Sequence, residues 1–246
     1  MRGWGAVFKR ELSGYFVTPV AYVFIVIFLI LAGVFAWDSG LGGFYERGQA
    51  DLRSFFGFMP WLFLFLIPAV SMRMWAEERK GGTIELLLTL PIAQTGAVVG
   101  KFLAAWAFAT IAVVLTFPMW ITVNYLGSPD NGAIFTAYVG TVLMAGGFLA
   151  VGSLLSASTK SQVIAFILTV VACFVLLLAG HPPVIEFLRG WAPAAIVEAV
   201  ATFSFLTRFD SLAKGVIDVR DIIFFGTLMG VCLAATGLVL DAKKAE

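Results

Sequence analysis

The sequence predicts an all-α integral membrane protein with six transmembrane helices. Apolar residues make up 61% of the 246 positions and charged residues 13%, which is about half the charged share of a soluble domain. Six apolar stretches are long enough to cross a hydrocarbon core as helices, because about 18 or more residues suffice. The six stretches are Val20–Trp37, Phe55–Met72, Phe102–Val123, Ala133–Leu155, Val163–Gly180 and Ile222–Leu240.

Residues 1–19 predict a helix that lies in the membrane interface before the first span. Trp4, Val7, Phe8 and Leu12 recur at helical spacing, and charged residues lie off this stripe, as in an interfacial amphipathic helix. Thr18-Pro19 predicts a bend into the first span, because the residue before proline avoids the helical conformation. We therefore expect an uncleaved N-terminal elbow helix.

The distribution of Lys and Arg predicts that both termini are cytoplasmic. An even number of spans puts both termini on one side, and an excess of positive charge marks the cytoplasmic side. With the termini inside, ten of the 16 Lys and Arg residues fall on that side: Arg2, Lys9, Arg10, Arg73, Arg79, Lys80, Lys101, Lys160, Lys243 and Lys244.

The cytosolic loop at residues 76–97 predicts a short apolar helix. Gly81-Gly82 ends the preceding helix, Thr83 is a suitable N-cap, and Pro91 ends the new helix after about two turns. So small a loop cannot bury its apolar residues, and an exposed apolar patch often marks an interface. From the residues alone, binding to a partner is as well supported as a position against the lipid or against the chain's own inner surface.

The extracytoplasmic segment 181–221 predicts re-entrant or interfacial helices before the last span. Ala194–Leu206 predicts one short, mostly apolar helix that is too short to cross the membrane. Glu198, Phe203 and Phe205 are its candidate outer-mouth residues, and Glu198 faces either cargo or an aqueous vestibule. In the last span, Gly226, Gly230 and Ala234 form a small-residue face that favours close helix packing, which we expect within the chain.

Several kinds of chemistry are not predicted. Residues 96–101 resemble a Walker A loop but have one residue too few between the glycines, and Phe102 replaces the magnesium-binding Ser or Thr. No metal-ligand spacing surrounds the single His181. A net charge of +1 without a basic run argues against nucleic-acid binding. The spans carry no ionisable residue at mid-membrane, which argues against an ion-coupled carrier.

The string EERKGGTIELLLTLPI, from Glu77 to Ile92, followed by Gly100-Lys101, resembles the signature of ABC transporter permeases of the type 2 class. These are six-span subunits that begin with an elbow helix and associate with a separate ATPase. A second string, Phe203 to Asp221, is similar to the gliding-motility-associated permease branch. In topology the resemblance covers nearly the whole chain, and in motif detail about 35 residues.

The resemblance implies that this chain is one permease domain, residues 1–246, in a bacterial inner membrane, and is not itself an enzyme. It implies a dimer with itself or a homologous permease and two copies of an ATP-binding subunit, which would hold ATP and magnesium. An auxiliary extracytoplasmic protein is left open, and the class favours export. The implied ATPase-coupling residues are Glu77, Glu78, Arg79, Thr83, Ile84, Glu85, Leu87 and Leu88.

Two alternatives remain at this level. The first is an ion-coupled secondary transporter, and the second is a membrane scaffold or receptor subunit that transports nothing. An ATPase that co-purifies with the chain would favour the permease over both.

Overall fold

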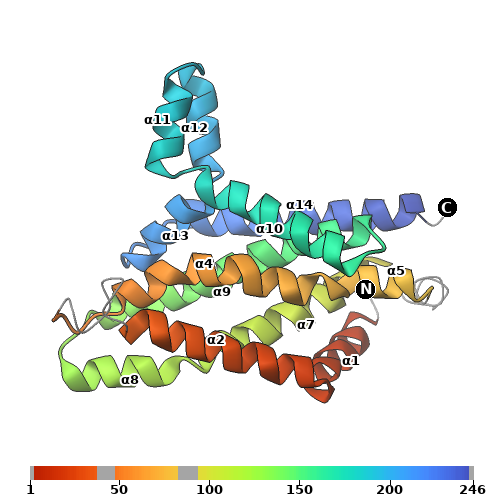
Figure 1. Cartoon of the computed structure of the whole chain (residues 1–246), viewed down its shortest axis with the longest axis horizontal. Coiled ribbons are helices and arrows are strands. Elements are labelled where there is room, and N and C mark those ends of the chain that lie inside the picture. Colours follow the sequence, from red (N-terminus) through yellow and green to blue (C-terminus); the bar gives the residue numbers. More distant parts are fainter. Residues whose placement is uncertain (1–2, 38–47, 83–93, 244–246) are drawn as a thin grey trace.

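The computed structural model describes residues 3–37, 48–82 and 94–243, and every regular element in these ranges is a helix. Long helices lie side by side, and one pair of shorter helices stands away from them (Figure 1). The helices are α1 (Trp4–Val17), α2 (Pro19–Trp37), α4 (Arg53–Ser71), α5 (Arg73–Lys80), α7 (Gln94–Val114), α8 (Phe117–Leu126), α9 (Asn131–Ser158), α10 (Gln162–Leu178), α11 (Pro182–Arg189), α12 (Ala194–Thr202), α13 (Phe205–Ala213) and α14 (Val219–Ala242).

The helices provide four to six candidate membrane spans. Four stretches are long and apolar enough on their own: Arg53–Lys80, Gln94–Leu126, Asn131–Ser158 and Val219–Ala242. Two further pairs meet the same criteria when each is taken as one span: α1 with α2, bent by 72°, and α10 with α11, bent by 74°. The all-α membrane class is therefore confirmed, and the six predicted spans correspond to the upper limit.

Helix α9 lies at the centre and packs against α4, α5, α7, α10, α13 and α14. Its glycines permit this close approach. A Cβ atom on Gly152 would lie 2.1 Å from Ser71 Oγ, and one on Gly146 would lie 2.7 Å from Met229 Sδ. Since non-bonded atoms do not approach so closely, a larger residue at either position would push α4 or α14 away from α9.

The small-residue face of α14 does not pack within the chain, contrary to our expectation. Gly226, Gly230 and Ala234 are exposed, and no atom lies within 4 Å of a Cβ built on either glycine. Phe225 and Met229 face the bundle instead. The close contact is made by large residues of α14 against glycines of α9, so the small residues lie on the other helix.

Helix α1 forms the expected elbow. It ends at Val17, Thr18 is extended with ψ of 137°, and α2 begins at Pro19. Helix α1 packs along α7, with Val7 buried. Gly100 of α7 makes this contact close, since a Cβ there would lie 2.8 Å from the carbonyl oxygen of Trp4.

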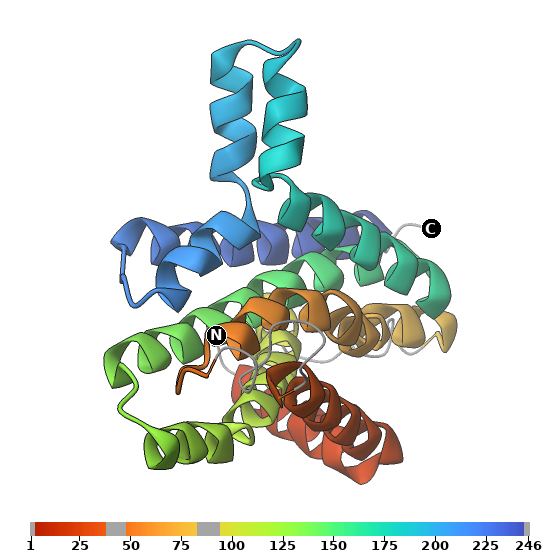
Figure 2. The same cartoon turned by 60° about the vertical axis from the view of Figure 1, so that its left-hand side comes forward.

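The segment before the last span contains three short helices. Helices α11 and α12 pack against each other and stand away from the bundle (Figures 1 and 2). The chain returns at Ser204, whose Oγ accepts a hydrogen bond from the Thr207 backbone N–H at 3.3 Å and so caps α13. The predicted single helix over 194–206 is therefore wrong in detail, because this cap starts a new helix at Phe205.

The packing of α14 leads to a first prediction. Gly146→Leu should destabilise the protein by about 1–3 kcal/mol, the usual cost of overpacking a filled core. Trp106 cannot easily yield, since its Nε1 donates to the Val142 carbonyl at 2.8 Å. Gly230→Leu is the control, because its side chain would enter open space. The measurement is the thermal midpoint of the detergent-solubilised protein; equal losses for both variants would contradict this packing.

Candidate functional site

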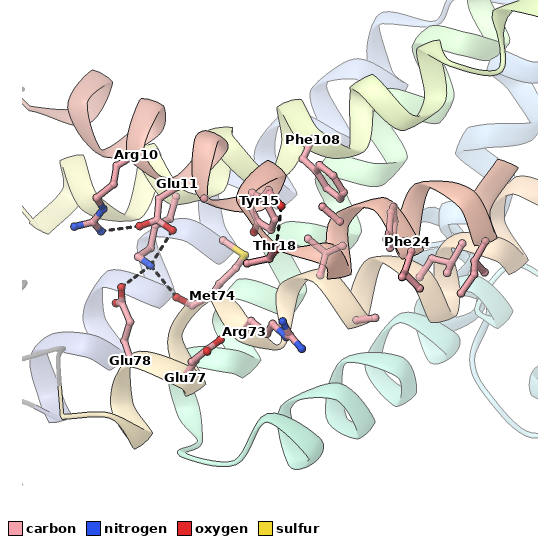
Figure 3. Close-up of a pocket in the computed structure, with 18 residues that line it drawn as sticks. Arg10, Glu11, Tyr15, Thr18, Phe24, Arg73, Met74, Glu77, Glu78 and Phe108 are labelled. Carbon is pink, nitrogen blue, oxygen red and sulfur yellow. Dashed lines mark hydrogen bonds and ion pairs between the residues drawn. The ribbon is translucent and has the colours of Figure 1, made fainter.

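Lys101 is a buried cation that joins three helices at one end of the bundle. Its side chain is 5% exposed, and Nζ lies 2.7 Å from Glu78 Oε1 of α5 and 3.4 Å from Glu11 Oε2 of α1. Nζ also donates a hydrogen bond to the Met74 carbonyl at 3.2 Å. Figure 3 shows these contacts as dashed lines between the three helices.

Arg10 completes the network by pairing with Glu11, at 2.6 Å between Nη2 and Oε1. The positive charges of Arg10 and Lys101 are therefore balanced by the negative charges of Glu11 and Glu78. Lys101 Nζ also lies 5.3 Å from the centre of the Trp75 ring, a favourable place for a cation. Breaking a buried pair by removing one partner costs about 3–5 kcal/mol. The network thus holds α1 and α5 against α7.

A serine of α9 caps the N-terminus of α5. Met72, between α4 and α5, keeps helical backbone angles, but the helical hydrogen bonding is interrupted there, so the first N–H groups of α5 need partners outside the helix. Ser156 Oγ accepts hydrogen bonds from the N–H groups of Trp75 and Ala76, both at 3.1 Å. The Ser156 hydroxyl donates to the Met72 carbonyl at 2.9 Å. The break in the helix is therefore repaired by a different helix.

Further contacts attach α5 to α9. Trp75 Nε1 donates to Ser153 Oγ at 3.0 Å, and Arg79 Nη1 donates to the Ala157 carbonyl at 2.9 Å. Trp75 is completely buried. Helix α5 thus cannot move without α9 and α7. We call this group, Lys101 with Glu11, Trp75, Glu78, Arg79, Ser153 and Ser156, the α5 anchor.

The other helix ends converge on the same end of the bundle. Gln94 Nε2 donates to the Gly237 carbonyl of α14 at 2.9 Å, and Lys243 Nζ donates to the Ser158 carbonyl of α9. The start of α1 and the end of α14 lie on the same side as α5 in Figure 1. This arrangement agrees with an even number of membrane crossings.

The residues implied for ATPase coupling divide into two groups. Glu78 and Arg79 belong to the α5 anchor, and Glu77 is exposed on the same helix. Helix α5 ends at Lys80, followed by Gly82 with φ of +68°, a conformation that favours glycine. The remaining five lie outside the described residues: Thr83, Ile84, Glu85, Leu87 and Leu88.

The outer-mouth residues are placed differently from one another. Glu198 is exposed on α12, and Phe203 is 55% exposed between α12 and α13. Phe205 is completely buried and packs against Phe148 and Phe225, at 5.0 and 5.5 Å between ring centres. In this conformation only Glu198 and Phe203 are available at the surface.

The base of the α11–α12 pair is held by an ion pair that the sequence reasoning missed. Arg208 Nη1 lies 3.0 Å from Oδ1 of the buried Asp221, and Arg208 Nε donates to the Thr202 carbonyl at 3.4 Å. Arg208 therefore ties the end of α12 to the start of α14.

The α5 anchor was also missed, although its residues carry weak signals. Lys101 directly precedes the third predicted span, Phe102–Val123, but α7 begins seven residues before Lys101, at Gln94. A lysine within an apolar helix is a sign of a buried ion pair. Ser153 and Ser156, one turn apart in an apolar helix, are another such sign, because buried hydroxyls need partners.

A cavity of about 650 Å³ opens beside the α5 anchor, between α1, α2, α4, α5 and α7. Charged residues line one half, and apolar residues of α2 and α4 line the other (Figure 3). Among the described residues, no three His, Cys, Asp or Glu side chains lie close enough together to hold a metal ion.

Comparison with known proteins agrees with this architecture. No curated protein matches the sequence. Residues 8–216 match the model of the family described as ABC-2 family transporter protein, which covers α1 from Phe8 onward, the α5 anchor and the α11–α12 pair. The chain therefore belongs to the ABC-2 transporter family, as a multi-pass membrane permease.

Proposed function

We propose that this chain is the permease subunit of an ATP-driven exporter in a bacterial inner membrane, with both termini in the cytoplasm. Family membership supports the permease role. The excess of Lys and Arg at the α5 end supports the orientation. Export rests on the resemblance to the type 2 class, and the string from Phe203 to Asp221 supports the gliding-motility-associated branch without identifying a cargo.

The α5 anchor is the observation that carries this proposal. A separate ATPase subunit, with its ATP and magnesium, binds the apolar segment 83–90 that follows α5. Movement of the ATPase pushes this segment, and α5 passes the displacement to α9 through Ser156 and Ser153 and to α7 through Lys101. A loosely attached helix would absorb the same displacement.

The functional unit is a dimer of this chain, or of this chain with a homologous permease, that carries two ATPase subunits. Helices α2 and α10, which contain the first and fifth predicted spans, both pack on α4. Each has an outward apolar face, with Val26 and Ile30 on α2 and Ile167 and Val171 on α10 all more than half exposed. A second permease would bury these faces. Glu198 and Phe203 then lie at the outer mouth.

The two alternatives make a different prediction about partners. An ion-coupled carrier needs an uncompensated titratable group in the membrane. Among the described residues, the buried charged side chains are Lys101, which pairs with Glu11 and Glu78, and Asp221, which pairs with Arg208. A scaffold or receptor needs no ATPase. Co-purification with an ATPase therefore separates the permease from both.

The coupling assignment predicts the effect of Leu87→Asp. An unpaired charge buried in an ATPase cleft is costly, and burying one Leu side chain contributes about 1.5–3 kcal/mol. The variant should insert and fold, because no span is changed, but lose the ATPase or hydrolyse ATP without transport. Pull-down and transport assays measure this. Thr95→Asp, exposed at the start of α7, is the milder control, and wild-type binding and transport by Leu87→Asp would refute the assignment.

The proposed transmission of movement from α5 to α9 predicts the effect of Ser156→Ala. This change removes the cap of α5 and should cost about 1–2 kcal/mol of stability. ATPase binding should persist, because segment 83–90 is intact, while transport per ATP hydrolysed should fall. Ser158→Ala is a matched control, since Ser158 Oγ donates only to Leu155 of its own helix. Unchanged coupling in both variants would show that the anchor does not transmit movement.

The orientation predicts the labelling of single cysteines in a chain whose Cys173 and Cys232 are replaced by Ala. Cysteine at the exposed Ser128, in the α8–α9 turn, should react with an impermeant maleimide in intact cells. Cysteine at the exposed Lys80, at the end of α5, should react only after the membrane is opened. The opposite pattern would invert the topology.

A further inference from the structure

The cavity beside the α5 anchor has a charged half and an apolar half. Its charged half contains Arg10, Glu11, Arg73, Glu77, Glu78 and Lys101. The apolar half lies between α2, through Phe24 and Ile27, and α4, through Leu66 and Ala69. Val23 and Ile27 of α2 are 54% and 42% exposed, so the apolar half is open on the α2 side.

Arg73 and Glu77 are the two charged residues of this cavity that the network leaves, and Arg73 is the cation that can bind an anionic group. Arg10, Glu11, Glu78 and Lys101 are engaged in the network described above. Among the described residues, Arg73 makes no ion pair and no side-chain hydrogen bond. Figure 3 shows its guanidinium pointing away from Glu11 and Glu78. A guanidinium in this position matches the geometry of a phosphate.

The Tyr15 hydroxyl is a second donor in the same half. Tyr15 lines the cavity and stacks on Phe108 with 5.0 Å between ring centres. Burial raises the pKa of Tyr15, the Glu11 carboxylate raises it further, and the charge of Arg73 opposes both. The hydroxyl therefore stays protonated and can donate a hydrogen bond, and both Tyr15 and Arg73 line the cavity.

The geometry points to a binding site for one membrane glycerophospholipid, whose phosphate lies between Arg73 and Tyr15 and whose acyl chain lies between α2 and α4. The six charged residues of the cavity sum to zero, so the site recognises the phosphate diester and not a net negative charge. An apolar wall next to phosphate donors fits an amphipathic ligand, and the volume is within the range of small-molecule sites. A free phosphate would leave the apolar half unfilled.

A lipid here would bridge the elbow helix and the α4–α5 break, because Tyr15 belongs to α1 and Arg73 is the first residue of α5. The site does not depend on the proposed transport function. Its failure would leave the ATPase-coupling proposal unaffected, since the test uses the isolated permease.

The test is native mass spectrometry of the full-length permease in detergent, titrated with dioleoyl phosphatidylethanolamine or dioleoylglycerol. The wild type should retain one phospholipid, and dioleoylglycerol, which lacks the phosphate, should bind at least about tenfold more weakly, as expected when a charge-assisted hydrogen bond is lost. Arg73→Gln should weaken phospholipid binding by a similar factor. Tyr15→Phe, which keeps the stacking on Phe108, should weaken it less.

Matched variants distinguish lipid binding in the cavity from lipid contact with other surfaces of the protein. Lys80→Gln removes an exposed cation of the same helix outside the cavity and should have no effect. Ala69→Trp should fill the apolar half and displace the lipid, whereas Val231→Trp, on an exposed face of α14, should not. Equal binding of dioleoylglycerol, full competition by inorganic phosphate, or equal effects of Arg73→Gln and Lys80→Gln would overturn the proposal. Loss of dimerisation by Ala69→Trp without loss of lipid would assign the cavity to a second copy.

Discussion

A lipid bilayer offers no hydrogen-bond partner, so every interruption of a helix within it has to be repaired by another part of the protein. In this chain the central helix α9 contributes side chains at two such interruptions. Ser156 supplies the partners for the break between α4 and α5. At the break between α7 and α8, the Thr116 hydroxyl donates to the Val113 carbonyl at 2.6 Å and lies 3.0 Å from the hydroxyl of Tyr138 on α9.

Because these repairs involve α9, this helix becomes the common partner of the bundle. This shared role explains the composition of α9. It has serines where a break in another helix needs hydrogen-bond donors and acceptors, and glycines where the neighbouring helices come closest. Gly152 and Ser156 show the two features one turn apart. Gly152 leaves room for the Ser71 side chain of α4, and Ser156 caps α5. Displacements at the α5 end can therefore reach most of the bundle through one helix.

Lys101 has a comparable role for the elbow helix. Its ammonium group is compensated by carboxylates of two different helices, Glu11 and Glu78, so α1 and α5 share one buried charge. The same arrangement places Arg73 and Tyr15 on the two sides of an amphipathic cavity. The coupling and lipid proposals thus concern adjacent surfaces of one structural unit but depend on different residues.

The sequence by itself determined the membrane class, the approximate spans, the elbow bend at Thr18-Pro19 and the family, because hydropathy, proline and a continuous motif are local signals. It did not determine which helix faces meet. Gly226 and Gly230 suggested a packing face on α14, yet the close contacts use Gly146 and Gly152 of α9. Phe205 and the Lys101 network were likewise decided by tertiary structure, since burial and ion pairing depend on residues more than 20 positions away in the chain.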